Sequence, residues 1–162
     1  MDARTESNIA PIRELTLTRV FDASRELVFK LWTDPEHLAR WWGPKMFTST
    51  VRCWEARAGG KIDLTMNMAN GGGHPMGGGF REVDPPKRLV FTSTAFEDKD
   101  GNAELENLNT VTFEDDNGKT KVTVHVVVLK ASAAMAGPLS GMEMGWSQSL
   151  DRLAEALAVG SS

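Results

Sequence analysis

Side chains suited to catalysis or metal binding are few in this 162-residue chain. The three histidines, His37, His74 and His125, are far apart, and none of them is paired with another ligand at metal-site spacing. Cys53 is the only cysteine, and the chain has no Ser-His-Asp arrangement and no nucleophile elbow. We therefore expect no metal, no cofactor and no catalytic residues, and the sequence favours a function other than catalysis.

The glycine-rich stretch 70–79 invites comparison with a phosphate-binding loop. It lacks the Gly-Lys-Ser/Thr ending of such loops, and it leads into a strand pattern where a phosphate loop leads into a helix. The interpretation that we favour is a mobile hairpin connection near the mouth of a cavity, where it would act as a lid.

Large apolar side chains suggest a different chemistry, the binding of a hydrophobic molecule. The chain contains eight Met, seven Phe and five Trp but no Tyr. Such side chains line small-molecule cavities, but they also fill protein cores, and both interpretations stay open for each residue. The residues predicted to bind the ligand are Met66, Met68, Phe80, Phe91, Phe113, Val124, Trp146 and Ser149.

Four small or polar residues bear on whether that cavity exists. Ser149 lies on the apolar side of a helical pattern, where Leu would be expected, and Gly145 lies at the edge of that side. Either they leave space for a ligand, or the helix approaches the sheet closely at Gly145 while Ser149 bonds back to a helical carbonyl. Asn107 and Asn109 share a strand face and offer polar contacts, or alternatively they end a loop.

A long C-terminal helix must position several of these residues. Over 140–159, the apolar residues repeat on one side at 100° per residue and the charged residues fall on the other. A helix of about 20 residues is about 30 Å long and can cross a whole small domain. Two short helices are also predicted, the first capped within 22–24 and ending near Thr33, the second starting at Asp34-Pro35.

Trp41 and Trp42 are adjacent at the end of the second short helix. Adjacent side chains on a helix point in different directions, so we predict that one of the two is exposed or covers the rim of the cavity. The alternative to simple packing is a homodimer contact, since exposed aromatic side chains mark interfaces.

The remaining patterns predict seven strands, one before the short helices and six after them. Short turns between consecutive strands require antiparallel pairing. The predicted fold is therefore α+β, with a strongly curved seven-stranded antiparallel sheet gripping the C-terminal helix. Residues 96–106 are predicted to be an acidic loop, and Asp115–Gly118 a tight turn. The strands are predicted at 15–21, 47–54, 61–68, 78–83, 88–94, 107–114 and 119–128.

Composition limits the partners and the compartment. A net charge of −4 without a basic run argues against nucleic-acid binding, and no apolar stretch is long enough for membrane insertion. A single cysteine fits a reducing cytoplasm. The length predicts one domain over 15–159, preceded by a flexible tail at 1–14.

Two stretches carry a resemblance to a known family: Trp-Thr-Asp-Pro-Glu-His-Leu-Ala-Arg-Trp-Trp-Gly-Pro at 32–44 and Gly-Met-Glu-Met-Gly-Trp-Ser-Gln-Ser-Leu-Asp-Arg-Leu at 141–153. They resemble bacterial homologues of the C-terminal domain of the heat-shock protein 90 ATPase activator, in the START-related (SRPBCC) helix-grip superfamily. Residues 80–91 and Gly59-Gly60 fit the same pattern, so that the resemblance spans about 15–157. It implies the helix-grip fold.

The resemblance leaves three functions open, because the superfamily includes lipid and hormone binders, cyclases, lyases and chaperone partners. The leading hypothesis is the binding of an unidentified small hydrophobic ligand between the C-terminal helix and the sheet. The second is a protein-interaction module that modulates a chaperone ATPase, which only the resemblance implies; the extra N-terminal domain of the eukaryotic activator has no counterpart in this sequence. The third is a cyclase- or lyase-like enzyme, which would need an acid–base pair in the cavity.

Overall fold

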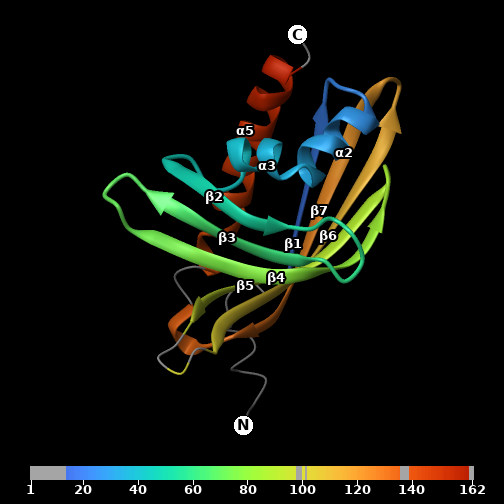
Figure 1. Cartoon of the computed structure of the whole chain (residues 1–162). Coiled ribbons are helices and arrows are strands. Elements are labelled where there is room, and N and C mark those ends of the chain that lie inside the picture. Colours follow the sequence, from blue (N-terminus) through green and yellow to red (C-terminus); the bar gives the residue numbers. More distant parts are fainter. Residues whose placement is uncertain (1–13, 98–99, 101, 136–138, 161–162) are drawn as a thin grey trace.

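A computed structural model shows an α+β fold in which a curved antiparallel sheet surrounds a long C-terminal helix (Figure 1). It describes residues 14–97, 100, 102–135 and 139–160. The predicted N-terminal tail thus lies almost wholly outside the described residues. The elements are β1 (Glu14–Phe21), α2 (Arg25–Thr33), α3 (Pro35–Trp41), β2 (Phe47–Trp54), β3 (Lys61–Met68), β4 (Gly73–Asp84), β5 (Arg88–Glu97), β6 (Ala103–Asp116), β7 (Lys119–Ala131), η1 (Ala133–Met135) and α5 (Met142–Gly160).

The sheet confirms the predicted antiparallel topology. Over the described residues seven strands pair in the order β1-β7-β6-β5-β4-β3-β2. Neighbours from β2 to β7 are consecutive in the chain, and only β1 joins the sheet beside a distant strand. The predicted turn between β6 and β7 narrows to Asn117-Gly118, where both residues have positive φ (55° and 87°), as a two-residue hairpin turn with matching twist requires.

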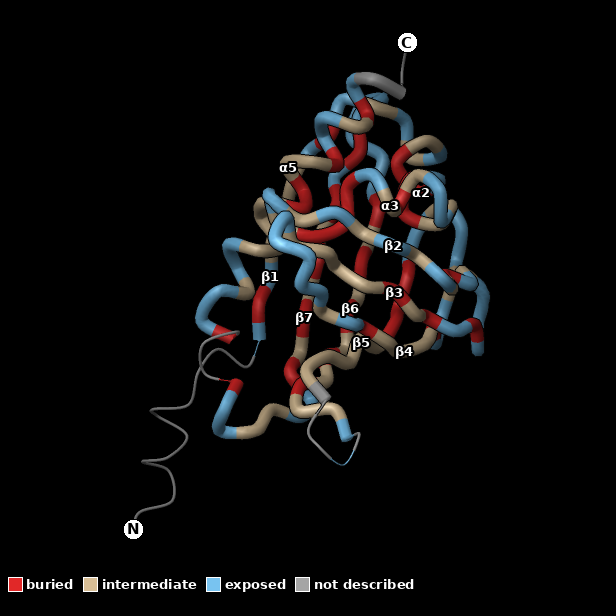
Figure 2. Tube along the Cα trace, turned by 60° about the vertical axis from the view of Figure 1, so that its left-hand side comes forward, coloured by how far each residue is buried: buried red, intermediate tan, exposed pale blue. Residues whose placement is uncertain are grey.

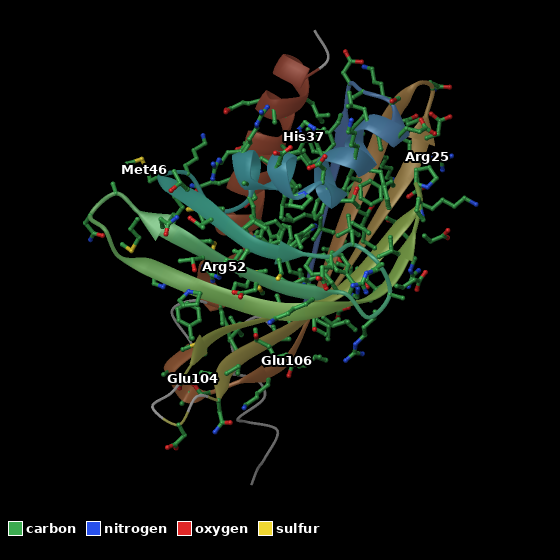
Figure 3. All side chains as sticks on the ribbon, in the orientation of Figure 1. Arg25, His37, Met46, Arg52, Glu104 and Glu106 are labelled. Atoms are coloured by element: carbon green, nitrogen blue, oxygen red, sulfur yellow. The ribbon has the colours of Figure 1, made fainter. Side chains whose placement is uncertain are left out.

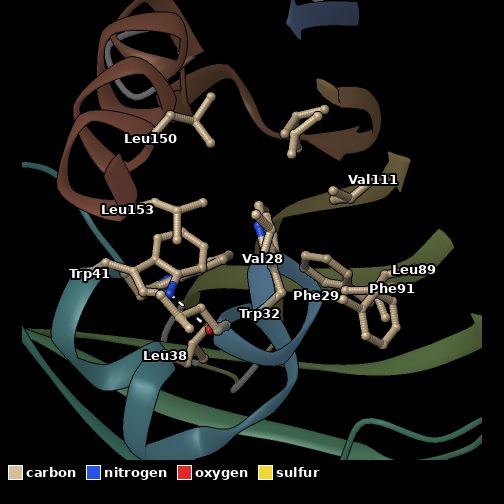
Figure 4. Packing of buried hydrophobic residues seen from close by; sticks show 14 of the residues in the cluster. Val28, Phe29, Trp32, Leu38, Trp41, Leu89, Phe91, Val111, Leu150 and Leu153 are labelled. Atoms are coloured by element: carbon tan, nitrogen blue, oxygen red, sulfur yellow. Dashed lines mark hydrogen bonds between the residues drawn. The ribbon is translucent and has the colours of Figure 1, made fainter. Parts of the chain in front are cut away.

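The concave face of the sheet is apolar and the helices cover it. Alternate residues of β6 and β7 are buried, as the burial tube shows along both strands (Figure 2). His125 falls between buried valines of β7 and lies on the outer face, where its ring contacts Glu14, as the alternation predicts. Leu150 and Leu153 project from α5 into the core between the helices and the sheet (Figure 4).

A salt bridge ties α5 to the edge strand β1. The Arg19 guanidinium donates to Asp151 Oδ1 and to Ser147 Oγ, each over 2.7 Å. The contact fixes the position of α5 along β1. The N-terminal half of α5 lines the cavity described below.

Both short helices begin where the sequence predicts. Ser24 Oγ accepts the Leu27 N–H at the start of α2, and Asp34 Oδ1 accepts the Glu36 N–H at the start of α3, with Pro35 in the first helical position. These caps satisfy amide groups that the helix itself leaves without partners.

Of the two alternatives predicted for the adjacent tryptophans, exposure to solvent is wrong, whereas a place at the cavity agrees with Trp42, which lines the cavity described below. Trp41 and Trp42 are both buried, because α3 ends between them and the chain leaves the helical path at Trp42. The Trp41 indole N–H donates to the Leu31 carbonyl (2.9 Å), a bond drawn in Figure 4. Trp42 packs at 5.4 Å from Trp54 and at 5.4 Å from Trp146.

Two segments that the sequence predicts to be loops, 70–79 and 96–106, are mostly strand in the structure. Residues 73–79 belong to β4, which pairs with β3 and β5 on its two sides, so ladder hydrogen bonds on both edges outweigh the low strand propensity of glycine. Gly78 has a φ of +145°, and a Cβ there would collide with the Thr92 carbonyl oxygen. Likewise, β5 and β6 stay paired as far as Glu97 and Ala103, so little of the expected acidic loop remains.

None of the helices in the described part of the chain is long and apolar enough to cross a membrane.

Candidate functional site

A cavity of about 370 Å³ lies between the N-terminal half of α5 and the sheet. Its walls come from three parts of the fold: α5 with the residue preceding it, the segment after α3, and the sheet from β2 to β6. Most of the lining side chains are apolar or aromatic. The lining residues are Trp42, Gly43, Pro44, Phe47, Met66, His74, Met76, Ser93, Ala95, Phe96, Leu105, Asn107, Asn109, Gly141, Met142, Gly145, Trp146 and Ser149.

The structure places three of the eight predicted ligand-binding residues on the cavity wall: Met66, Trp146 and Ser149. Met66 comes from the end of β3, where the sheet extends past the helices and its apolar face is only half-buried. Trp146 stacks against Trp32 at a distance of 6.2 Å between ring centroids, and it also lines the cavity.

The other five predicted residues are outside the cavity lining. Phe80, Phe91, Phe113 and Val124 are buried in the packed core, as Figure 4 shows for Phe91. Aromatic contacts occupy their faces, such as Phe80 with Phe91 at 5.5 Å. Met68 is half-buried and ends β3 beyond the cavity. The alternation of apolar residues identifies the concave face of the sheet. It does not show which residues of that face pack in the core under the helices and which line the cavity.

Phe47, His74 and Phe96 form a group of rings on the cavity wall that the sequence interpretation did not include. His74 lies 6.1 Å from Phe47 and 5.7 Å from Phe96, measured between ring centroids. Phe96 has a φ of 60°, unusual for a bulky residue. Strand alternation would place its side chain on the outer face, yet it lines the cavity beside Ala95. No sequence pattern signals that irregularity.

Polar side chains of α5 hold the segment after α3 in place as part of the wall. The Gly43 N–H donates to Ser149 Oγ (3.1 Å), and the Lys45 N–H donates to Gln148 Oε1 (3.0 Å). One helical turn on, Arg152 donates to the carbonyl oxygens of 42–44 over 3.0–3.2 Å. The helix thus fixes one side of the cavity rim through hydrogen bonds with the backbone.

These contacts decide between the two interpretations of the small residues on α5. Ser149 accepts a hydrogen bond from the segment after α3, so its hydroxyl has a tertiary role. A Cβ at Gly145 would meet Pro44 Cγ at 3.6 Å, an ordinary van der Waals distance, and the residue lines the cavity. Gly145 therefore faces that segment and the cavity, and the close approach of helix to sheet considered from the sequence is absent there.

Asn107 and Asn109 are polar groups on an otherwise apolar part of the wall. They belong to β6, on its concave face, and are 8% and 1% exposed, so the alternative that they end a loop is wrong. Asn109 Nδ2 donates to the Phe91 carbonyl (3.3 Å) and to Ser93 Oγ (3.0 Å). Asn107 Nδ2 faces Met142 Sδ at 3.9 Å.

The cavity wall carries little charge. Among the described residues, His74 is the one titratable side chain that lines it, and no described carboxylate or Lys/Arg side chain does so. Glu104 and Glu106, which alternate with the cavity-lining residues of β6, lie on the lower part of the sheet in Figure 3. Burial lowers the pKa of Arg152, while neighbouring Glu155 acts in the opposite direction. The described residues of the wall thus include neither a carboxylate pair nor a base–acid pair, one of which hydrolytic or cyclising chemistry needs.

Metal binding finds no support among the residues that the structure describes. No group of three or more His, Cys, Asp or Glu side chains there is placed to hold an ion.

A curved antiparallel sheet around a C-terminal helix, with a cavity between them, defines a helix-grip protein. The family follows from the sequence match. Residues 22–158 match the family described as Activator of Hsp90 ATPase homolog 1-like protein, and the chain belongs to that family. A comparison with curated proteins found no significant match.

Solved structures of bacterial proteins share the fold. A protein from Chromobacterium violaceum is 28% identical, with a TM-score of 0.77, over 88% of this chain and 95% of that one. The AHSA1 protein from Silicibacter pomeroyi is 25% identical, with a TM-score of 0.76, over 91% of this chain and 99% of that one. An Arthrobacter aurescens protein has a TM-score of 0.81 at 23% identity, over 93% of this chain and 91% of that one.

Proposed function

We propose that the protein binds a small hydrophobic molecule in the cavity between α5 and the sheet. The observation that carries this proposal is an apolar cavity of about 370 Å³, within the range of about 300–1,000 Å³ typical of small-molecule sites. A folded core of this size is otherwise packed to nearly crystalline density, with few voids larger than a water molecule.

The chemistry of the wall suits an apolar ligand of variable shape. Trp42 and Trp146 offer large aromatic surfaces at right angles, with an angle of 80° between their rings. Met66, Met76 and Met142 offer unbranched, polarisable side chains that adapt to irregular shapes. We place this function in the cytoplasm, since the one cysteine, Cys53, is a free thiol.

The test is a fluorescence titration with an apolar probe such as 1-decanol, because two of the five tryptophans line the cavity. Ala95→Phe places a ring in the cavity from β5, and we expect it to abolish the change in fluorescence. Thr94→Phe is the matched control: it is the adjacent residue on the outer face, and its neighbours across the sheet are Gly77, which has no side chain, and Glu106. An unchanged spectrum with the wild-type protein would refute the proposal.

A chaperone partner is the second candidate, and the family match supports it. The test is the ATPase rate of a bacterial heat-shock protein 90 with and without saturating protein. Stimulation would support the candidate, and an unchanged rate would refute it. Burial of Trp41 and Trp42 removes the exposed aromatic side chain on which the homodimer expectation rested. The enzyme hypothesis has less support, because the described residues of the wall include no acid–base pair.

A further inference from the structure

Two buried hydrogen-bond acceptors on the cavity wall have no donor among the described protein groups. They are the side-chain carbonyl oxygens of Asn107 and Asn109, neighbours two residues apart on the concave face of β6. A buried carbonyl without a donor destabilises the folded state, so such groups are rare in folded proteins and call for an explanation.

The orientation of the Asn109 amide follows from its neighbours. Its Nδ2 lies 3.3 Å from the Phe91 carbonyl oxygen, which can only accept a hydrogen bond. Rotating the amide by 180° would set two acceptors against each other, so Nδ2 faces β5 and the free group is Oδ1. Asn107 Nδ2 faces the sulfur of Met142, a weak acceptor, which again leaves Oδ1 as the free group. Asn109 therefore offers an acceptor and has both amide hydrogens engaged, whereas Asn107 offers an acceptor and engages one amide hydrogen with the sulfur.

The location of these acceptors distinguishes them from other unpaired buried atoms. Among the described residues, Arg25 Nε and Trp32 Nε1 also lack partners, but neither residue lines the cavity. In the part of the chain that the structure describes, the two asparagine oxygens are the buried atoms without a partner that belong to residues lining the cavity. Ser93 lies beside them, and its hydroxyl is engaged with Asn109 Nδ2.

We propose that the ligand is an uncharged amphiphile whose hydroxyl or amide N–H group donates hydrogen bonds to Asn107 and Asn109, while its apolar part fills the cavity. This inference rests on the proposed function. A carboxylate or phosphate head group does not fit, because it would set acceptors against acceptors. A buried ammonium does not fit either, because none of the described residues that line the cavity is a carboxylate that would balance its charge.

The test compares 1-decanol with decyl methyl ether, in which a methyl group replaces the hydroxyl hydrogen and so removes the donor, by titration of tryptophan fluorescence. We expect wild-type protein to bind the alcohol about tenfold more tightly than the ether. The ether is the more hydrophobic of the two, so partition from water alone would give the opposite order. Decanoate is expected to bind more weakly than either probe at neutral pH.

Two variants test whether the preference for the alcohol over the ether comes from the asparagine acceptors. Asn107→Leu removes one acceptor and keeps the number and branching of the side-chain heavy atoms, and we expect the ratio of the two dissociation constants to fall toward one. Met66→Leu alters the same wall without touching an acceptor, and it should change both affinities together and leave the ratio unchanged. Asn109→Leu is the second acceptor variant, although it also removes the bond to Phe91.

The outcomes separate this inference from the function on which it rests. If neither probe binds wild-type protein, both fail. If alcohol and ether bind wild-type protein equally well, as they would when a water molecule bridges to the asparagines, the inference fails and hydrophobic binding stands. A tenfold ratio that survives in both asparagine variants also overturns the inference. Should neither variant fold, the wild-type ratio alone decides.

Discussion

Replacing Arg152 by Met should loosen the side of the cavity formed by the segment after α3. The guanidinium donates to four carbonyl oxygens, those of Arg40, Trp42, Gly43 and Pro44, over 3.0–3.2 Å. Hydrogen bonds to a charged donor each contribute about 1.5–3 kcal/mol. Three of these four share one nitrogen, so their contributions do not add in full. Methionine keeps the apolar stem of the side chain and removes the donors.

The expected loss is therefore about 2–3 kcal/mol of unfolding free energy. For a chain of 162 residues, an unfolding entropy of about 2.1 cal/mol/K per residue converts this loss into a fall in Tm of about 6–9 °C. Differential scanning calorimetry measures that fall directly. Binding of 1-decanol should weaken in the same variant, because three of the freed carbonyls belong to cavity-lining residues.

Arg57→Met is the control. Arg57 has a side chain that is 68% exposed and a 3.5 Å ion pair with Glu55, and exposed pairs contribute about 0–1 kcal/mol. If Arg152→Met melts at the same temperature as this control, the reasoning that α5 holds the segment through Arg152 is wrong.

Three further variants test separate parts of the structure. Ser149→Ala removes the acceptor of a buried backbone N–H on the cavity rim and should cost about 1–3 kcal/mol in urea unfolding; a loss below about 0.5 kcal/mol would contradict that role. Gly78→Ala should prevent folding or cost more than about 3 kcal/mol, because a Cβ collides with the Thr92 carbonyl oxygen; a stable variant would show that the strand can shift. The hydrogen bond from Arg52 holds the pKa of the Asp63 carboxyl below its ordinary value, so any stability from this exposed pair is present above that ordinary value and is lost as the pH falls through the lowered pKa. An NMR titration should find the midpoint of Asp63 raised in Arg52→Ala, and an unchanged midpoint would contradict the assignment.

Most of the fold could be predicted from the sequence because its signals are local. Apolar alternation identifies the concave face of the sheet, Ser24 and Asp34-Pro35 mark the two helix starts, and Asn117-Gly118 marks a hairpin. Each of these signals depends on neighbours within a few residues in the chain. The extent of β4 was missed because its glycines have little intrinsic preference for a strand, and pairing with β3 and β5 decides the outcome.

The cavity was predicted less well because its wall depends on distant contacts. Phe91 and Met66 belong to the same apolar face, but only the position of the helices buries the first in the core and leaves the second at the cavity. Trp42 reaches the wall because α3 ends just before it, and Phe96 reaches it through an irregular backbone conformation. Ser149 was rightly singled out as an anomaly, yet its partner, Gly43, is 106 positions away in the chain.

The most direct test of the proposed binding site is a crystal structure with a bromine-labelled probe, such as 10-bromo-1-decanol, located by the anomalous scattering of bromine. The proposal predicts a bromine peak inside the cavity, within van der Waals distance of its aromatic and methionine side chains. The inference about the asparagines further predicts the probe hydroxyl within about 3 Å of Asn107 or Asn109 Oδ1. A cavity filled by its own side chains, with bromine found only on the outer surface, would contradict the account.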